Sequence, residues 1–233
     1  MIVVAARDRS ADGRGPSAPN PGGTGDAGVR GRRIQGVVLC GGQSRRMGRD
    51  KALVSWGDES LLRTATDTLR AVTPAVFLAT GEGVRYGELG LETVLDRAPG
   101  LGPLAGLEAA LEKLVRDDGE LLCVLACDMP FAEARLFELL VRRIEERGLD
   151  ALLLRQEERL EPLCAVYRST TLPAVRRALD EGRRALRSFH AEVRVETVAP
   201  DELSPGLERA TVNLNTPADL AEARDLGDAP RRL

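Results

Sequence analysis

A segment rich in glycine and arginine has the residue types that bind an anion such as a phosphate. It runs from Leu39 to Lys51 and contains Gly41-Gly42 followed by Arg45, Arg46 and Arg49. Glycines let the backbone approach a phosphate closely and aim N–H groups at it. Arginine and lysine add charge and donors. The spacing matches neither G-x-x-x-x-G-K-[ST] nor G-x-G-x-x-G. On the residues alone, an anion-binding loop and a solvated turn with surface arginines both remain open.

Two aspartates follow apolar runs directly and are candidate ligands. Asp96 comes after the run 92–95, and Asp128 comes after the run 121–126, within Cys-Asp-Met-Pro. A carboxylate just past a buried strand is a common Mg²⁺ ligand, because Mg²⁺ takes one or two carboxylates and completes its shell with water and phosphate. Asp128 would serve equally well as the N-cap of the next helix. The residues alone leave these two roles open.

Three further segments combine polar residues with proline. Gly-Pro-Leu-Ala-Gly at 102–106 predicts a rigid turn into a helix. The first N–H groups of that helix could face a ligand, or the segment could be a plain loop-to-helix junction. Arg-Leu-Glu-Pro-Leu at 159–163 leads into an apolar strand. In Asn-Leu-Asn-Thr-Pro at 213–217, Thr216 fits a helix N-cap and Pro217 the first turn, and capping alone would explain this pair.

The elements that must position these residues alternate between strands and helices. The apolar patterns predict strands at 34–39, 75–80, 92–95, 121–126, 151–154 and 163–167, and helices at 60–72, 104–115, 132–147, 170–181 and 217–224. This alternation predicts an α/β fold: a three-layer, Rossmann-like, mostly parallel sheet with helices on both faces. Ligands bind beyond the carboxyl ends of such strands. We therefore expect the glycine turn, Asp96 and Asp128 to meet at one edge.

The glycine-rich segment also resembles a known family. Its pattern Gly-Gly-x-Ser-x-Arg-Met-Gly-x-Asp-Lys, from Gly41 to Lys51, is similar to the signature loop of the molybdenum cofactor guanylyltransferases. These belong to the glycosyltransferase-A-like nucleotidyltransferases, with the nucleotide-diphospho-sugar transferase type of fold. The resemblance runs from Ile34 to about Arg224 with the other motifs in the same order. It implies transfer of GMP from GTP to the phosphate of molybdopterin, with Mg²⁺ as cofactor and pyrophosphate as the second product.

The resemblance also assigns roles to individual residues. Lys51 is the implied phosphate-binding lysine and Asp128 the implied metal ligand, and both are the expected catalytic residues. The implied nucleotide-binding residues are Leu39, Cys40, Gly41, Gly42, Lys51, Asp96 and Asp128. The residues implied on the molybdopterin side are Pro162, Asn213 and Asn215.

Two positions depart from the family pattern. Cys40 stands where the family usually has alanine, which is a small change. The family often has an asparagine near the end of the second strand that touches the nucleotide, and residues 77–80 contain none. That contact is therefore either missing or made by Thr80.

Two other functions stay open. One is a nucleotidyltransferase of the same fold with another substrate, from the cytidylyl branch or acting on a sugar phosphate. The cytidylyl branch tends to carry Ala-Ala-Gly where this chain has Cys-Gly-Gly, and it lacks Gly-Pro-Leu-Ala-Gly. The other is a non-catalytic nucleotide-binding chaperone for a molybdoenzyme, which loss of Lys51 or Asp128 would have favoured. Both residues are present.

The composition limits which binding partners and which cellular location are expected for this protein. The 233 residues are 43% hydrophobic and 30% charged, with a formal net charge of −3. Such a chain gives no reason to expect nucleic acid as a partner, and no apolar run reaches the roughly 18 residues of a membrane span. We expect a cytoplasmic monomer whose four cysteines are reduced thiols. GTP and molybdopterin are the implied partners, with molybdoenzymes and cofactor-insertion proteins beyond them.

The two ends are expected to lie outside the folded domain. Residues 1–33 are rich in Gly, Pro, Ser, Asp and Arg, and they predict a disordered tail. Residues 34–226 are expected to form a single nucleotidyltransferase domain, and residues 227–233 a short flexible tail.

Deleting the residues before Gly31 should leave both stability and activity nearly unchanged, because their composition cannot offset the entropy of ordering them. Thermal unfolding and pyrophosphate release of the full and shortened chains provide the check. A melting temperature lower by several degrees in the shortened chain would contradict this prediction.

Overall fold

The computed structural model describes residues 33–41, 50–98 and 100–225. The predicted tails lie almost wholly outside this part of the chain, as do Gly42 and the three arginines after it. The division into tails and one domain therefore stays a prediction.

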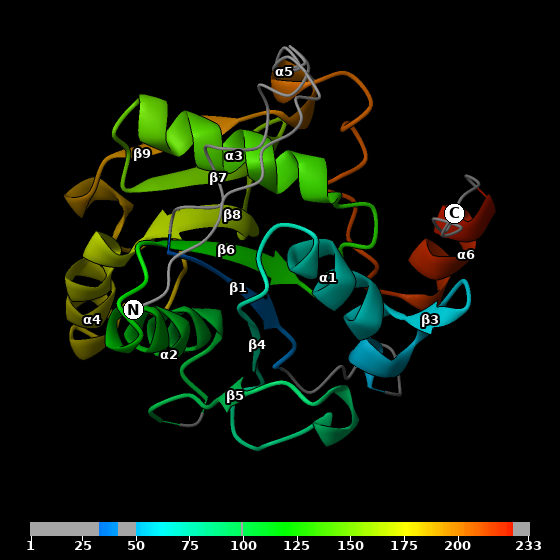
Figure 1. The fold of residues 1–233 in the computed structure, drawn as a ribbon, viewed down its shortest axis with the longest axis horizontal. Helices are drawn as coiled ribbons and strands as arrows, with labels where there is room; N and C mark the ends of the chain where they lie inside the picture. The colour runs from blue at the N-terminus through cyan, green and yellow to red at the C-terminus, as the bar shows by residue number, and fades with distance from the viewer. Residues whose placement is uncertain (1–32, 42–49, 99, 226–233) are drawn as a thin grey trace, which may run out of the picture. The chain divides into compact units, whose positions relative to one another are not determined.

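A sheet of seven strands forms the middle layer, in the order β5-β4-β1-β6-β8-β7-β9 (Figure 1). In that order the strands are Thr93–Val94, Val76–Ala79, Ile34–Leu39, Leu121–Ala126, Arg159–Arg168, Ala151–Gln156 and Val195–Val198. Only β8 runs against its neighbours, since it pairs antiparallel with β6 and β7 while the other pairs are parallel. The mostly parallel sheet that the sequence predicts is confirmed.

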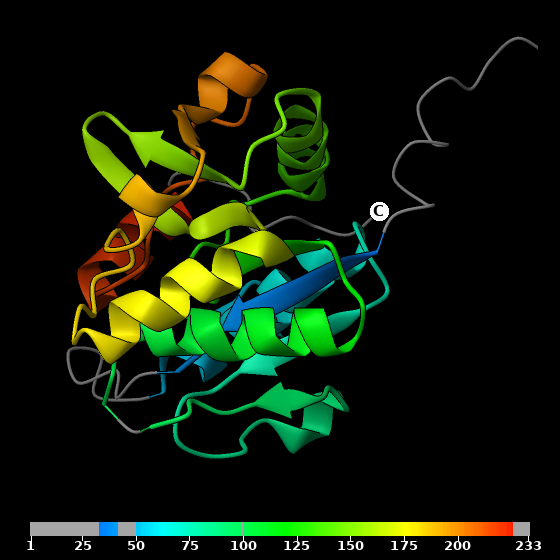
Figure 2. The same ribbon diagram turned by 90° about the vertical axis from the view of Figure 1, so that its left-hand side faces the viewer.

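Helices cover both faces of this sheet. Helices α1 (Leu61–Arg70) and α3 (Ala134–Glu146) pack on one face. Helices α2 (Pro103–Arg116) and α4 (Leu172–Asp180) lie side by side on the other (Figure 2). Strands covered on both faces read as continuous apolar runs, and β6 is buried along its whole length. None of the described helices is long and apolar enough to cross a membrane.

The central strands end at the same level. Leu39, the last residue of β1, pairs with Ala79 of β4 on one side and with Ala126 of β6 on the other. Gly36, within β1, lets α1 pack closely, because a Cβ there would lie 3.1 Å from the Cβ of Leu69. The residues that follow β1, β4 and β6 therefore emerge together at one edge.

Several elements differ from the prediction. The strands predicted at 151–154 and 163–167 are longer, and they form a hairpin in which β7 reaches Gln156 and β8 begins at Arg159. The hairpin end carries five consecutive polar residues, so it shows no apolar pattern. Three elements were not predicted from the sequence: β9, the short helix α5 (Pro200–Leu203) and a small hairpin of β2 (Ser55–Trp56) and β3 (Glu59–Ser60).

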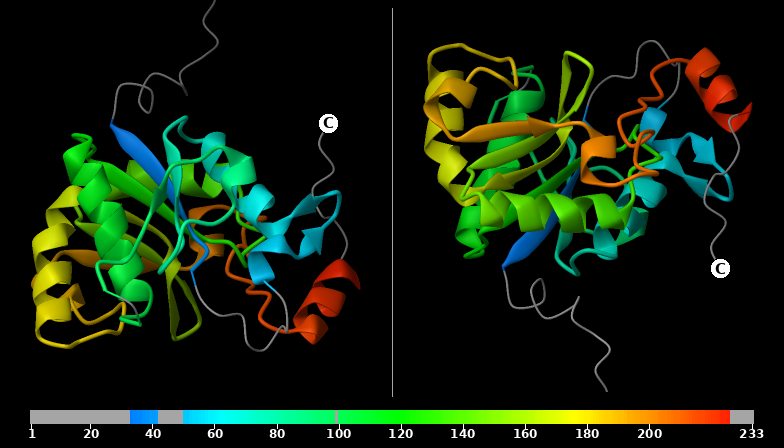
Figure 3. Two further views of the ribbon diagram at one scale, coloured as in Figure 1. Left: turned by 90° about the horizontal axis from the view of Figure 1, so that it is seen from below. Right: turned by 90° about the horizontal axis from the view of Figure 1, so that it is seen from above.

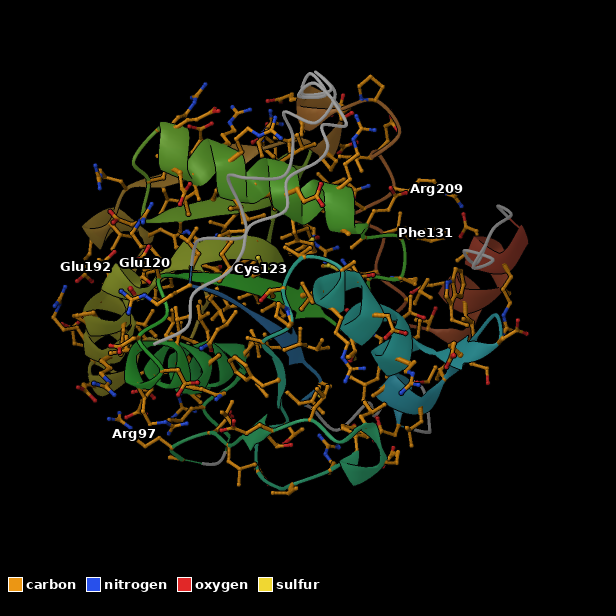
Figure 4. All side chains as sticks on the ribbon, in the orientation of Figure 1. Arg97, Glu120, Cys123, Phe131, Glu192 and Arg209 are labelled. Carbon is orange, nitrogen blue, oxygen red and sulfur yellow. The ribbon has the colours of Figure 1, made fainter. Side chains whose placement is uncertain are left out.

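A second apolar cluster joins the β2–β3 hairpin to α6 (Pro217–Asp225), and the two lie together in both views of Figure 3. Trp56 packs edge-on against Phe131, with ring centroids 5.3 Å apart. Arg209 lies over the Phe131 ring, 4.3 Å from its centroid (Figure 4). Leu214 is buried in the same cluster. The cluster therefore connects the segment just after Lys51 with the segment that carries Asn215.

Candidate active site

A cavity of about 810 Å³ opens at the edge where β1, β4 and β6 end. Its walls come from the turn after β1, the loop after β4, the segment after β5, the start of α2 and the residues after β6. The lining includes Leu39, Cys40, Gly41, Lys51, Asp96 and Asp128. The structure thus brings together every nucleotide-binding residue suggested by the sequence that lies in its described part. Gly42 lies outside that part.

The turn after β1 stays close to the end of β4. The Cys40 N–H donates to the Ala79 carbonyl at 3.0 Å. A Cβ on Gly41 would lie 3.2 Å from the backbone of Thr80 and Gly81. No side chain fits there without moving the neighbouring loop. Burial raises the pKa of the Cys40 thiol to about 12, so this side chain stays neutral and acts as a small apolar group.

Lys51 contacts both Asp128 and Asn215, and it lines the cavity together with Asp128. Asp50 caps the short helix η1 (Lys51–Leu53) by accepting from the Ala52 N–H at 3.1 Å. The Lys51 ammonium donates to Asp128 Oδ2 and, at 2.9 Å, to Asn215 Oδ1. The lysine and aspartate side chains are only 14% and 19% exposed, so water screens this pair weakly. The two residues expected to be catalytic are therefore an ion pair in this structure.

Asp128 has one oxygen that fits a metal ion. Its Oδ1 is buried and accepts no hydrogen bond from the described residues, which is unfavourable for a carboxylate unless a cation or water supplies the partner. Asp128 does not cap the next helix, since the N-cap of α3 is Glu133. Within residues 33–41, 50–98 and 100–225, no three acidic, histidine or cysteine side chains form a metal cluster. A Mg²⁺ at Asp128 would therefore take its other ligands from phosphate and water.

Asp96 lies across the cavity, beneath the start of α2. Its backbone N–H donates to the Gly81 carbonyl at 2.9 Å. A Cβ on Gly106 would lie 3.3 Å from Leu39 Cδ2 and 3.7 Å from Asp96 Oδ1, so the first turn of α2 lies beside the carboxylate. Burial, followed by the charges of Glu82 and Glu108, raises the pKa of Asp96. The group is thus a half-buried carboxylate with space for a donor.

The helix α2 begins as the Gly-Pro sequence predicts. Gly102 is its N-cap with φ 77°, and Pro103 is its first residue. That backbone conformation strongly favours glycine. Both residues line the cavity, so the N-terminus of the helix faces the space where a ligand would lie.

The segment 213–217 runs alongside Asp128. The Leu214 N–H donates to the Asp128 carbonyl at 2.9 Å, which places Asn215 against Lys51. Thr216 caps α6 by accepting from the Asp219 N–H at 3.1 Å, as expected, and the Asp219 carboxylate accepts from the backbone N–H of Asn215 and Thr216. Asn215 therefore belongs to the site, and its position is fixed by the start of a helix.

Pro162 and Asn213 lie beside the cavity rather than in its wall. The register between β7 and β8 shifts near Pro162, and the next residue, Leu163, lines the cavity. The Pro162 carbonyl accepts from the Tyr167 hydroxyl at 2.8 Å. The Asn213 amide donates to the Thr211 carbonyl at 3.3 Å. Burial raises the pKa of the neighbouring Glu161, while Arg159 and Asn213 act in the opposite direction. Any contact of these two residues with a substrate stays a prediction.

The loop after β4 forms a wall of the cavity, and only its first residue, Thr80, was named from the sequence. Thr80, Gly81, Glu82, Gly83 and Arg85 all line it. The Thr80 hydroxyl donates to the Gly83 carbonyl at 2.6 Å, so its proton is used within the loop. Two glycines spaced by one residue directly after a strand were the available signal, since this is the pattern of a tight turn near a ligand.

Known proteins with the same architecture identify the family. Residues 36–196 match the sequence model of the MobA-like NTP transferase domain. The probable molybdenum cofactor guanylyltransferase of Pelotomaculum thermopropionicum is 35% identical over 198 residues, which are 84% of this chain and 94% of the relative. The molybdenum cofactor guanylyltransferase of Rhodobacter capsulatus is 34% identical over 197 residues, 83% of this chain and 96% of the relative.

A solved structure agrees with these relatives. Molybdopterin-guanine dinucleotide biosynthesis protein A from Archaeoglobus fulgidus superposes with a TM-score of 0.71 and 26% identity, over 82% of this chain and 97% of that one. The sheet is that of a nucleotidyltransferase. The chain belongs to the MobA-like NTP transferase family, as the glycine-rich segment predicts.

Replacing Gly41 by valine should weaken nucleotide binding by about tenfold or more, because the side chain must displace the backbone of Thr80 and Gly81. Calorimetric titration with a nucleotide measures the change. Gly87→Ala is the matched control, since a Cβ there meets nothing within 4 Å and Gly87 does not line the cavity. Equal affinity of Gly41→Val and wild type would show that the nucleotide does not depend on this turn.

Proposed function

We propose that this protein transfers GMP from GTP to the terminal phosphate of molybdopterin, forming the guanine dinucleotide cofactor and pyrophosphate. The contact of Lys51 with Asp128 in the cavity carries the proposal, because it combines a phosphate-binding ammonium with a carboxylate oxygen free for Mg²⁺. The names of the relatives support the guanylyl and molybdopterin specificity. They do not favour the cytidylyl, sugar-phosphate or chaperone alternatives.

The reaction needs positioning and neutralisation of charge more than proton transfer. A phosphate oxygen of molybdopterin forms the new bond to the α-phosphorus of GTP. The bond from that phosphorus to the bridging oxygen breaks, and pyrophosphate leaves with the electron pair. The attacking phosphate is already ionised near neutral pH, so no general base is required. The described cavity wall contains no histidine, and the single histidine, His190, lies in η4 (His190–Glu192) outside it.

Lys51 and Asp128 have different roles in this proposal: Lys51 binds the phosphates, and Asp128 binds the metal ion. The Lys51 ammonium neutralises Asp128 in the free protein and would donate to the β- and γ-phosphate oxygens once GTP is bound. Asp128 would then hold Mg²⁺ through Oδ1. When bound, Mg²⁺ supplies positive charge at the phosphate oxygens, where negative charge develops. Asn215 keeps Lys51 aligned through its amide oxygen at 2.9 Å.

The opposite side of the cavity suits a guanine base. Asp96 offers two acceptor oxygens beneath the start of α2, and the backbone at residues 102–106 adds further polar groups. Guanine presents adjacent N–H donors on its N1 and N2 atoms, which one carboxylate can accept together. Cytosine and adenine each have an acceptor at the matching ring nitrogen. A site built to accept from two donors therefore rejects those bases.

Turnover with GTP should exceed turnover with CTP or ATP by about a hundredfold, since unpaired polar groups cost several kcal/mol in total. Pyrophosphate release from each nucleotide with Mg²⁺ and molybdopterin is the measurement, and omission of molybdopterin is the control. Equal rates with CTP and GTP would refute the guanylyl assignment but leave the fold and family intact.

Asp128→Asn should lower pyrophosphate release by about 10²–10³ while preserving the fold. The amide oxygen can still accept from Lys51, whereas a neutral amide is a poor Mg²⁺ ligand. Circular dichroism and thermal unfolding test the fold. Asp118→Asn is the control, because Asp118 is 86% exposed, lies outside the cavity and has a left-handed φ of 56° that Asn tolerates. Near-wild-type release from folded Asp128→Asn would place the metal elsewhere.

Cytoplasmic location, the monomeric state and the further partners stay predictions. GTP and molybdopterin are the substrates in this proposal. Molybdoenzymes and cofactor-insertion proteins would follow as recipients of the product.

A further inference from the structure

Arg85 and Tyr86, on the loop after β4, contact residues at both ends of the segment from Cys40 to Asp50. The Arg85 Nη2 donates to the carbonyls of Cys40 and Thr80, at 3.1 Å each. Its Nη1 lies 3.6 Å from Asp50 Oδ2. The Tyr86 hydroxyl donates to the same Asp50 oxygen at 2.7 Å. One dipeptide therefore holds the residue before Gly41 and the residue before Lys51.

Asp50 connects Tyr86 and Arg85 to the short helix η1, which begins at Lys51. Its Oδ1 caps η1 by accepting from Ala52, while its Oδ2 receives Tyr86 and faces Arg85. Lys51 is the first residue of η1. The orientation of Asp50 thus fixes the direction in which Lys51 leaves the backbone toward Asp128.

The backbone at Tyr86 indicates that this arrangement is held in place. Tyr86 has a φ of 63°, a left-handed conformation that is unfavourable for a residue with a Cβ. Such conformations persist where the surroundings impose them, and they concentrate at functional sites. Tyr86 is 7% exposed. Burial and then the hydrogen bond to Asp50 raise its pKa, so the hydroxyl keeps the proton that it donates.

We propose that Arg85 and Tyr86 are positioning residues for the nucleotide site. They hold Cys40 and Asp50 relative to each other, and they thereby set where the Gly41 backbone and the Lys51 ammonium meet the nucleotide phosphates. This inference rests on the proposed function, because it takes the ligand to be a nucleoside triphosphate. Both Nη2 hydrogens are used on carbonyls, and Nη1 faces a carboxylate. Arg85 therefore acts through the protein backbone rather than on the phosphates.

The competing role is a direct phosphate contact, because Arg85 also lines the cavity. Lysine distinguishes the two roles. A lysine ammonium can replace an arginine as a point charge near a phosphate, but it lacks the planar fork that reaches two carbonyls and a carboxylate at once. A positioning role predicts that Arg85→Lys resembles Arg85→Met. A phosphate contact predicts that lysine restores affinity.

The experiment compares Arg85→Met, Arg85→Lys and Tyr86→Phe with wild type. Calorimetric titration with GTP gives both the Kd and the number of sites, and pyrophosphate release gives kcat and KM. Arg70→Met is the matched control, because Arg70 is an exposed arginine at the end of α1 with one ion pair to Asp67 at 3.8 Å. The fluorescence of Trp56, the only tryptophan, gives a second binding signal near Lys51.

We expect both Arg85 variants to raise the Kd for GTP by about tenfold or more, and Tyr86→Phe by about threefold, with the number of sites near one. The Arg85→Met/Tyr86→Phe double variant should be less than additive, because both residues act on Asp50. A merely structural role would instead reduce the number of sites and the melting temperature and leave the Kd unchanged, which would overturn the inference.

Recovery of wild-type affinity by Arg85→Lys would also overturn it, in favour of a phosphate contact. Parallel titrations with CTP and ATP separate this inference from the proposed function. If wild type binds another nucleotide more tightly than GTP, the guanylyl assignment fails. The positioning role is then tested by the effect of Arg85→Met on the Kd for that nucleotide.

Discussion

The arrangement of the site depends on the register of three parallel strands. Leu39 pairs with both Ala79 and Ala126, so β1, β4 and β6 end together. The next residues along the chain then emerge side by side at one edge of the sheet. A shift of one residue in either pairing would turn the following side chains to the opposite face and would separate the glycine turn from Asp128. The last residues of these three strands, Leu39, Ala79 and Ala126, also line the cavity.

Around the cavity at this edge, glycines let backbone segments lie close together, which limits what the cavity can bind. A Cβ on Gly41 would press on the backbone of Thr80 and Gly81, and Gly102 has a φ of 77° that favours glycine. Around them, six charged residues line the described part of the cavity: Asp50, Lys51, Glu82, Arg85, Asp96 and Asp128. Lys51 is bound to Asp128, and the buried Cys40 thiol adds no charge because its pKa is raised to about 12. The site therefore combines the Lys51–Asp128 ion pair with a separate, half-buried carboxylate at Asp96.

Much of this architecture could be predicted from the sequence, because its main signals are local. The buried strand β6 is a continuous apolar run, and β1 is apolar apart from Gln35. The glycine, proline and aspartate residues that follow these strands are contiguous motifs. The hairpin of β7 and β8 was underestimated because its exposed end carries charged residues. Arg85 could not be recognised, because its partners are backbone carbonyls up to 45 positions away. Every residue has a backbone carbonyl whatever its type, so the sequence does not show which carbonyls a side chain will contact.

The reversed direction of β8 has a consequence for how the two substrates are accommodated. Because β8 runs against β6, it brings the beginning of a strand, with Glu161 and Leu163, to the edge where the other strands end. Most of the described cavity wall comes from segments that follow β1, β4, β5 and β6, whereas Leu163 comes from the β7–β8 hairpin. That hairpin pairs with β6 and β9 but not with β1, β4 or β5, so a change at its exposed end would leave the pairing of those three strands intact. A single antiparallel strand thus lets one part of the cavity wall vary separately from the segments that follow the parallel strands.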